Sequence, residues 1–222
     1  MLPGLYFPVS LEGKNVNLDE NTLRVDLIAG ADFNQREAMI SYILMELLLD
    51  HNRKVLEGKN AAKIFFFNLC ECETSYEKDY ARQIGLWCCD KIIYVTPEQL
   101  KKGLEKAFEC ISSAHEGEKP ILIFSGMEYW DRALGEMPEQ ASAIEALMRK
   151  LIGPSKTRNS RQIYSGDPSL INSVLIPADS HVKWLTDKNQ VIDKWGRDFP
   201  FQTWDGPALT DVNSFIRKIE GL

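Results

Sequence analysis

The sequence is short of the features that assign a function directly. Its three histidines, His51, His115 and His181, are too scattered to form a catalytic triad with any candidate nucleophile. No apolar run approaches the ~20 residues that a membrane-spanning helix needs, and the first ten residues carry no basic region ahead of an apolar core. We therefore expect an intracellular protein with no membrane partner.

The five cysteines are poorly spaced for a disulfide framework or a metal site. The odd number of five argues against a framework of disulfides and favours a reducing compartment. The two pairs are C-x-C and, after fifteen intervening residues, C-C, whereas structural zinc sites usually space their ligands C-x₂₋₄-C. We expect no metal ion at these cysteines, which are Cys70, Cys72, Cys88, Cys89 and Cys110.

Positive charge is in deficit. The net charge of −6 excludes a surface that is basic throughout, so any contact with nucleic acid must be local. The 222 residues suit one globular domain, which buries roughly 70% of the surface of its unfolded chain. We expect a single domain over 1–222, with an N-terminal extension at 1–22 and a polar basic loop at 153–172.

Apolar runs separated by polar segments predict the order of elements. Strands are expected at 24–29, 63–69, 91–95, 121–124 and 173–176, and helices at about 34–51, after a Thr96–Gln99 capping box, and from Pro138 to Gly153. Strands that alternate with helices predict an α/β fold with a mostly parallel central sheet flanked by helices. The segments QVIDKW and FQTWDG predict a hairpin, and therefore antiparallel strands at the C-terminal edge.

The segment 23–44, LRVDLIAGADFNQREAMISYIL, has the layout of a phosphate-binding P-loop: a strand, a glycine and then an apolar helix. Laid on the pattern G-x-x-x-x-G-K-[ST], it matches only at Gly30. Gln35 adds bulk where the backbone must approach phosphate, and Arg36 replaces the compact lysine ammonium with a planar guanidinium. Glu37 places an anion where a hydroxyl should hold magnesium. The P-loop is therefore degenerate.

The helix N-terminus in this segment does not need a ligand to satisfy its backbone amides. Asp32 is placed to cap the helix N-terminus, with Gln35 three residues later in capping-box position. The helix amides that would bind a phosphate are then satisfied by the protein's own carboxylate. Asp32 is also the second carboxylate at this loop, after Glu37, and the two negative charges together repel ATP.

The rest of an ATPase site is missing from the sequence. The fourth apolar strand should end on an aspartate that helps to hold magnesium, but it runs into Ser125, and the nearest acids, Glu128 and Asp131, lie beyond it. The second strand should deliver a carboxylate that activates water, but it offers Cys70. We expect no catalytic residue, no cofactor and no ATP binding. An enzyme with a rebuilt site at Cys70, Cys72 or Arg36 is the least favoured alternative.

Three segments, KIFFFNLCECETSYEKDYARQIG, DKIIYVTPEQLKKGLEKAFECISS and KPILIFSGMEYWDRA, resemble the RecA-fold core of eukaryotic recombinase paralogues. The resemblance spans about 23–152 and lies in the order and spacing of elements. It implies a RecA-like P-loop NTPase core in a nuclear, non-enzymatic subunit of a heteromeric mediator of homologous recombination repair. Such a subunit binds a RecA-like paralogue or recombinase, and DNA or the recombinase filament. The alternative is a RecA-like scaffold subunit of another assembly, such as the tRNA-modifying Elongator complex.

The segment RKLIGPSKTRNSR, at 149–161, holds five positive charges and no acid. In the RecA fold that the resemblance implies, loops in this region face DNA. Lys156, Arg158 and Arg161 are therefore the predicted DNA-binding residues, and single-stranded DNA is the predicted nucleic-acid partner. The alternative is a solvated loop after a helix. Tyr164 is the only nearby aromatic residue, so a platform for base stacking is thin.

Overall fold

The structure is a computed structural model of the chain. It describes residues 5–6, 17–18, 25–30, 33, 36, 40, 43, 44, 47, 48, 51, 54–72, 92–114, 119–153, 159–176, 181–185, 190–193 and 198–200. Within these residues, no helix is long and apolar enough to cross a membrane.

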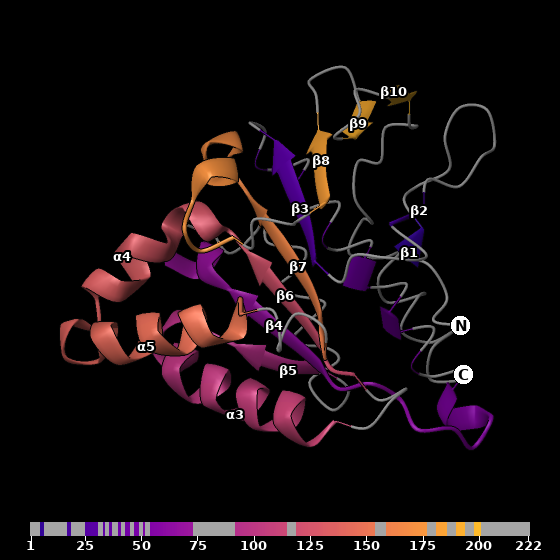
Figure 1. Ribbon diagram of the computed structural model, residues 1–222, viewed down its shortest axis with the longest axis horizontal. Coiled ribbons are helices and arrows are strands. Elements are labelled where there is room, and N and C mark those ends of the chain that lie inside the picture. The colour runs from indigo at the N-terminus through magenta and orange to yellow at the C-terminus, as the bar shows by residue number, and fades with distance from the viewer. Residues whose placement is uncertain are drawn as a thin grey trace.

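A mixed sheet forms the centre of the fold, and its described part has eight strands in the order β10-β9-β8-β3-β7-β6-β4-β5 (Figure 1). Neighbouring strands from β8 to β5 run parallel, whereas β8–β9 and β9–β10 are antiparallel pairs. The strands are β3 (Val25–Gly30), β4 (Ile64–Asn68), β5 (Ile92–Val95), β6 (Ile121–Ser125), β7 (Arg161–Gly166), β8 (His181–Leu185), β9 (Gln190–Asp193) and β10 (Asp198–Pro200). Two short strands, β1 (Leu5–Tyr6) and β2 (Asn17–Leu18), pair separately.

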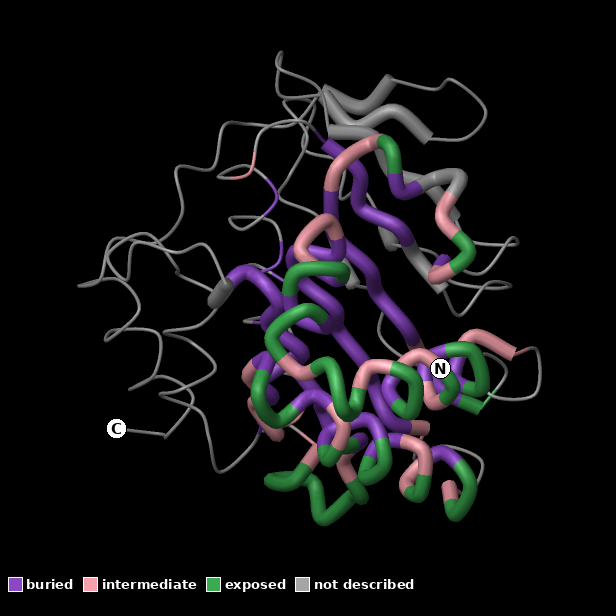
Figure 2. The backbone as a smooth tube through the Cα atoms, turned by 90° about the vertical axis from the view of Figure 1, so that its left-hand side faces the viewer, coloured by how far each residue is buried: buried purple, intermediate pink, exposed green. Residues whose placement is uncertain are grey.

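Helices cover both faces of the sheet. One face packs against α3 (Leu100–Ser113), α4 (Trp130–Gly135) and α5 (Pro138–Leu151), seen in front of the strands in Figure 2. The other face is covered by the helix that follows β3, whose described residues between 33 and 56 are helical. Short 3-10 turns follow four strands: η1 (Leu69–Cys72), η3 (Pro97–Gln99), η4 (Met127–Tyr129) and η5 (Pro168–Asn172).

The core explains why the central strands are almost continuously apolar. Every residue of β4 and β6 is buried, as expected for parallel strands covered on both faces. Successive side chains point to opposite faces, so Phe65 and Phe67 meet α3–α5 while Phe66 points the other way. On the α3–α5 side the rings of Phe67, Phe124 and Tyr164 form a stacked row across three strands, with centroids 4.4 and 5.0 Å apart.

The predicted α/β architecture is confirmed, with a parallel sheet flanked by helices. The helix expected after Thr96 begins as the 3-10 turn η3 and becomes α-helical at Leu100. Thr96 is the N-cap and Pro97 lies in the first turn, as predicted, but the capping box is wrong because the Thr96 side chain makes no capping hydrogen bond. Its hydroxyl instead donates to Glu98 Oε2 at 2.6 Å, and this hydrogen bond lowers the pKa of Glu98.

The prediction of a polar loop over 153–172 is wrong in its second half, where the chain forms β7 and η5. The sequence does not reveal this strand because two of its polar residues, Gln162 and Tyr164, are buried and hydrogen-bonded inside the fold. Gln162 Nε2 donates to Leu151 O at 3.0 Å and to Ser160 Oγ at 2.9 Å, and Tyr164 donates its hydroxyl to Gln162 Oε1 at 2.8 Å. These hydrogen bonds satisfy groups that read as solvent-exposed in the sequence.

The strand predicted at 173–176 is also wrong, because these residues form a turn after η5. Ser173 Oγ accepts a hydrogen bond from Leu175 N, and Ile176 N donates to Ser173 O, which closes the chain on itself. The strand beside β3 is β8, which begins at His181. Of the predicted hairpin, QVIDKW supplies β9, whereas FQTWDG lies outside the described residues.

Candidate functional site

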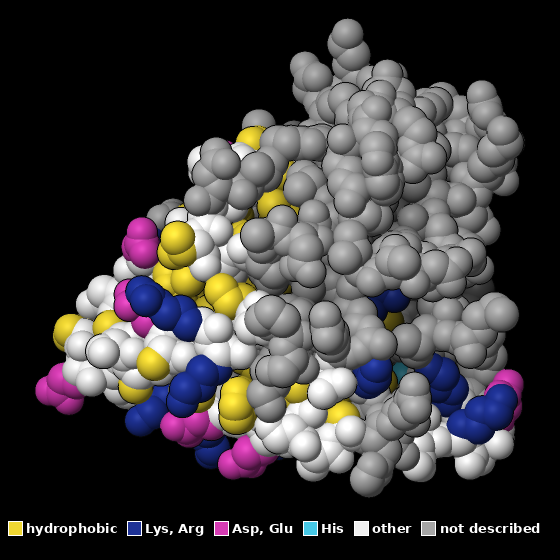
Figure 3. Space-filling model, viewed as in Figure 1, with side chains coloured by type: hydrophobic (Ala, Val, Ile, Leu, Met, Phe, Trp, Pro, Cys, Tyr) yellow, Lys and Arg dark blue, Asp and Glu magenta, His cyan; other side chains and the backbone are white. Residues whose placement is uncertain are grey.

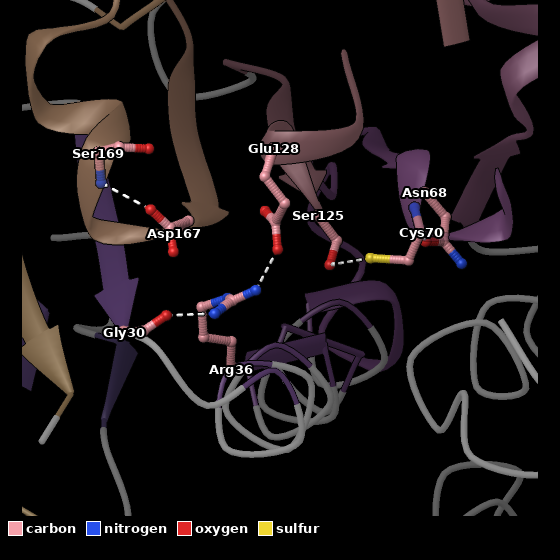
Figure 4. Close-up of polar contacts among 8 residues, drawn as sticks. All are labelled: Gly30, Arg36, Asn68, Cys70, Ser125, Glu128, Asp167 and Ser169. Carbon is pink, nitrogen blue, oxygen red and sulfur yellow. Dashed lines mark hydrogen bonds and ion pairs between the residues drawn. The ribbon is translucent and has the colours of Figure 1, made fainter. Parts of the chain in front are cut away.

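The candidate site lies at the carboxyl ends of β3, β7, β6 and β4. Because these strands are parallel, their last residues meet at the same edge of the sheet, where open α/β sheets bind their ligands. Gly30 ends β3, Gly166 ends β7, Ser125 ends β6 and Asn68 ends β4. The side chains drawn in Figure 4 come from these strand ends and from the segments that follow them.

Arg36 lies at the start of the helix after β3, and its side chain is only 4% exposed. Its guanidinium donates one hydrogen bond to the carbonyl of Gly30 and a second to Glu128 Oε1, with which it forms an ion pair (Figure 4). The guanidinium carbon also lies 5.7 Å from the centre of the Phe33 ring. The residue at the position of the P-loop lysine is therefore turned inward and engaged by the protein itself.

Glu128 reaches Arg36 because the chain turns sharply after β6. Gly126 has φ = +73°, in the left-handed region, and a Cβ there would lie 2.3 Å from Cys70 Sγ. Only glycine fits this turn, which folds η4 back over the helix start. Tyr129, next to Glu128, packs its ring edge-on against Phe33 at 6.4 Å.

The second carboxylate oxygen of Glu128 is held less well than the first. Oε2 is buried and has no hydrogen-bond partner among the described residues. It lies against the end of β7, since a Cβ added at Gly166 would be 2.7 Å from it. Glu128 therefore meets Arg36 through one oxygen only.

A further carboxylate, Asp167, follows β7 at the same edge. It caps η5, with Oδ1 accepting a hydrogen bond from Ser169 N at 2.8 Å. This hydrogen bond, then one from the Ser169 side chain, and then the positive charge of Arg36 lower the pKa of Asp167. Arg36 therefore lies in the field of two acidic groups.

The other strand ends carry buried polar side chains. Ser125, which stands where an ATPase has its magnesium-binding aspartate, is fully buried, with its Oγ 3.7 Å from Cys70 Sγ. Asn68 donates to the Tyr94 hydroxyl at 2.9 Å and accepts from the amide of Cys70 at 3.1 Å. The ends of β4 and β6 therefore present an amide, a thiol and a hydroxyl, not carboxylates.

The structure brings together three of the residues predicted from the sequence: Gly30, Arg36 and Ser125. Asp32, Gln35 and Glu37 lie outside the described residues. From the sequence, Glu128 is only an acid that lies beyond its strand, and no local pattern predicts its contact with Arg36. Asp167 is not predicted either, although an aspartate before a proline is a signal for a helix cap.

The predicted DNA-binding residues lie elsewhere. Lys156 and Arg158 are outside the described residues, and Arg161 begins β7, at the sheet edge opposite the Arg36–Glu128 contact. Tyr164 is fully buried, and burial raises its pKa, so it offers no ring to a base. On the face drawn in Figure 3, the described basic and acidic side chains are interspersed.

Fold and site together define an α/β, P-loop-like domain in which an internal ion pair occupies the position of the P-loop lysine. No protein-family model matches the sequence, and a search of curated proteins gives no match. The structure is similar to the conjugation coupling protein TcpA of pCW3, solved in monomer form with ATPγS, with a TM-score of 0.60 and 11% identity over 98% of this chain and 71% of that one. It is also similar to the cytoplasmic domain of EssC, with a TM-score of 0.57 and 12% identity over 89% of this chain and 42% of that one. At such identities the likeness shows the fold alone.

Proposed function

We propose that this chain is a RecA-like subunit of a heteromeric assembly and that it neither binds nor hydrolyses ATP. The observation that carries the proposal is the contact of Arg36 with Glu128 and the Gly30 carbonyl. A P-loop binds nucleotide through a free cation and exposed backbone amides. Here the cation is buried and already neutralised by an internal carboxylate.

Electrostatics support the same conclusion. A triphosphate entering this edge would meet the carboxylates of Glu128 and Asp167, and Asp167 is held in its charged form. Its magnesium ion would find Ser125 against a thiol at the end of β6, where an ATPase supplies an aspartate. In the described residues, no group of three His, Cys, Asp or Glu side chains is placed to hold a metal ion.

We further propose that the assembly is a nuclear mediator of homologous recombination, with a RecA-like paralogue or a recombinase as the partner. The sequence resemblance over 23–152 supports this role. The position of Arg161 is compatible with it, because DNA held at the amino ends of the strands leaves the opposite edge to the partner. Lys156 and Arg158 precede it in the same basic segment.

Purification of the tagged chain from its native cells, at native expression level, tests the assignment. We expect a RecA-like paralogue or recombinase to co-purify in a fixed ratio and to form a monodisperse complex with the chain in sedimentation. Recovery of a tRNA-modifying assembly would contradict the recombination role and support the scaffold alternative. A stable monomer with no RecA-like partner would contradict the subunit role itself.

A further inference from the structure

The negative charge that neutralises Arg36 is a carboxylate of the same chain, that of Glu128. A guanidinium that is 4% exposed must be neutralised, since an unpaired buried charge is strongly unfavourable. Glu128, 92 residues away in the sequence, supplies that neutralisation. A carboxylate and a phosphate offer a guanidinium the same kind of acceptor oxygens, so one can take the place of the other.

Glu128 is an imperfect partner for this cation. An arginine fork can meet a carboxylate with two parallel hydrogen bonds, but here Glu128 uses Oε1 alone. Within the described part of the chain, Oε2 stays buried without a hydrogen-bond partner, which weakens the closed arrangement. Glu128 is also the outer member of the pair, with 19% of its side chain exposed against 4% for Arg36.

We propose that Glu128 is an autoinhibitory plug, which closes an anion site at Arg36 that otherwise takes a polyphosphate. This inference rests on the proposed function, because it explains how a P-loop-like chain excludes nucleotide by its own side chain. Asp167 follows β7 at the same edge of the sheet and adds a second, more exposed negative charge there.

Glu128 lies on an element that makes two contacts with the same helix. Glu128 and Tyr129 both belong to η4, and both contact the start of the helix that follows β3, at Arg36 and Phe33. Gly126, at a positive φ, is the single residue that joins η4 to β6. The position of the carboxylate at Arg36 is therefore fixed by the same turn that places Tyr129 against Phe33.

Calorimetric titration with magnesium-free inorganic tripolyphosphate tests the plug. We expect no binding by the wild-type chain and saturable binding by Glu128→Ala, which removes the carboxylate. Glu128→Gln keeps a neutral acceptor and should bind more weakly than Glu128→Ala. Adding Asp167→Asn to Glu128→Ala should raise the affinity by about two- to fivefold, because one opposing but solvent-screened charge is lost.

Two further variants test whether the gain in tripolyphosphate binding arises at Arg36. Glu136→Gln removes the same charge from an exposed residue just after α4, and it should bind no better than the wild type. Arg36→Ala in the Glu128→Ala background should abolish the gain. The plug is overturned if folded Glu128→Ala and Glu128→Gln both bind like Glu136→Gln, or if the gain persists without Arg36. Hydrolysis of ATP by the wild-type chain would instead refute the proposed function.

Discussion

Replacing Arg36 by alanine should lower the free energy of unfolding by about 3 kcal/mol, because it leaves Glu128 in the site without its cation. Removing one partner of a buried ion pair typically costs ~3–5 kcal/mol, and the 19% exposure of Glu128 places this case at the lower end. The carbonyl of Gly30 also loses its guanidinium donor. Urea denaturation followed by circular dichroism measures the change, and an unaltered slope shows that the two-state transition is kept.

The matched control is the double variant Arg36→Met with Glu128→Met, which removes both charges and keeps the volume. Apolar replacement of a buried ion pair is often neutral or stabilising, so the double variant should recover most of the lost stability. If Arg36→Ala costs under about 1 kcal/mol, the ion pair does not hold this edge of the sheet together.

Replacing Phe124 by alanine should cost about 3–5 kcal/mol, the range for a large aromatic side chain removed from a core. Phe124 is fully buried and is the middle ring of the stacked row, 4.4 Å from Phe67 and 5.0 Å from Tyr164. Its loss therefore leaves a cavity between two rings that are fixed on neighbouring strands. The same denaturation experiment gives the value.

Phe124→Leu is the control for ring stacking, since leucine fills much of the cavity. It should cost under half as much as Phe124→Ala. Equal losses in the two variants would mean that the stacking geometry, and not the buried volume, dominates the contribution of this side chain.

The sequence predicts best those elements that a single local pattern defines. β4, β5 and β6 agree with the predicted strands to within one residue at each end, because each is a short apolar run bounded by polar residues. β7 is not predicted because Gln162 and Tyr164 pair inside the fold, and no local pattern indicates such pairing. The turn at 173–176 was misread because Leu175 and Ile176 resemble a strand, although Val174 is 78% exposed.

The residues of the candidate site also differ in how well the sequence predicts them. Gly30, Arg36 and Ser125 could be found from motif positions, since a degenerate motif keeps its spacing. The partnership of Arg36 with Glu128 could not, because it joins residues 92 positions apart and depends on the left-handed turn at Gly126. A carboxylate three residues past a strand end has no fixed direction until that turn is known.

Titration of the purified wild-type chain with magnesium-ATP tests whether the ion pair of Arg36 and Glu128 excludes nucleotide. If the ion pair of Arg36 and Glu128 closes the site, the heats equal those of dilution up to millimolar nucleotide, and no ATP is hydrolysed. Saturable binding in the micromolar range that is lost in Arg36→Ala would show that nucleotide displaces Glu128 unaided, and would contradict the account.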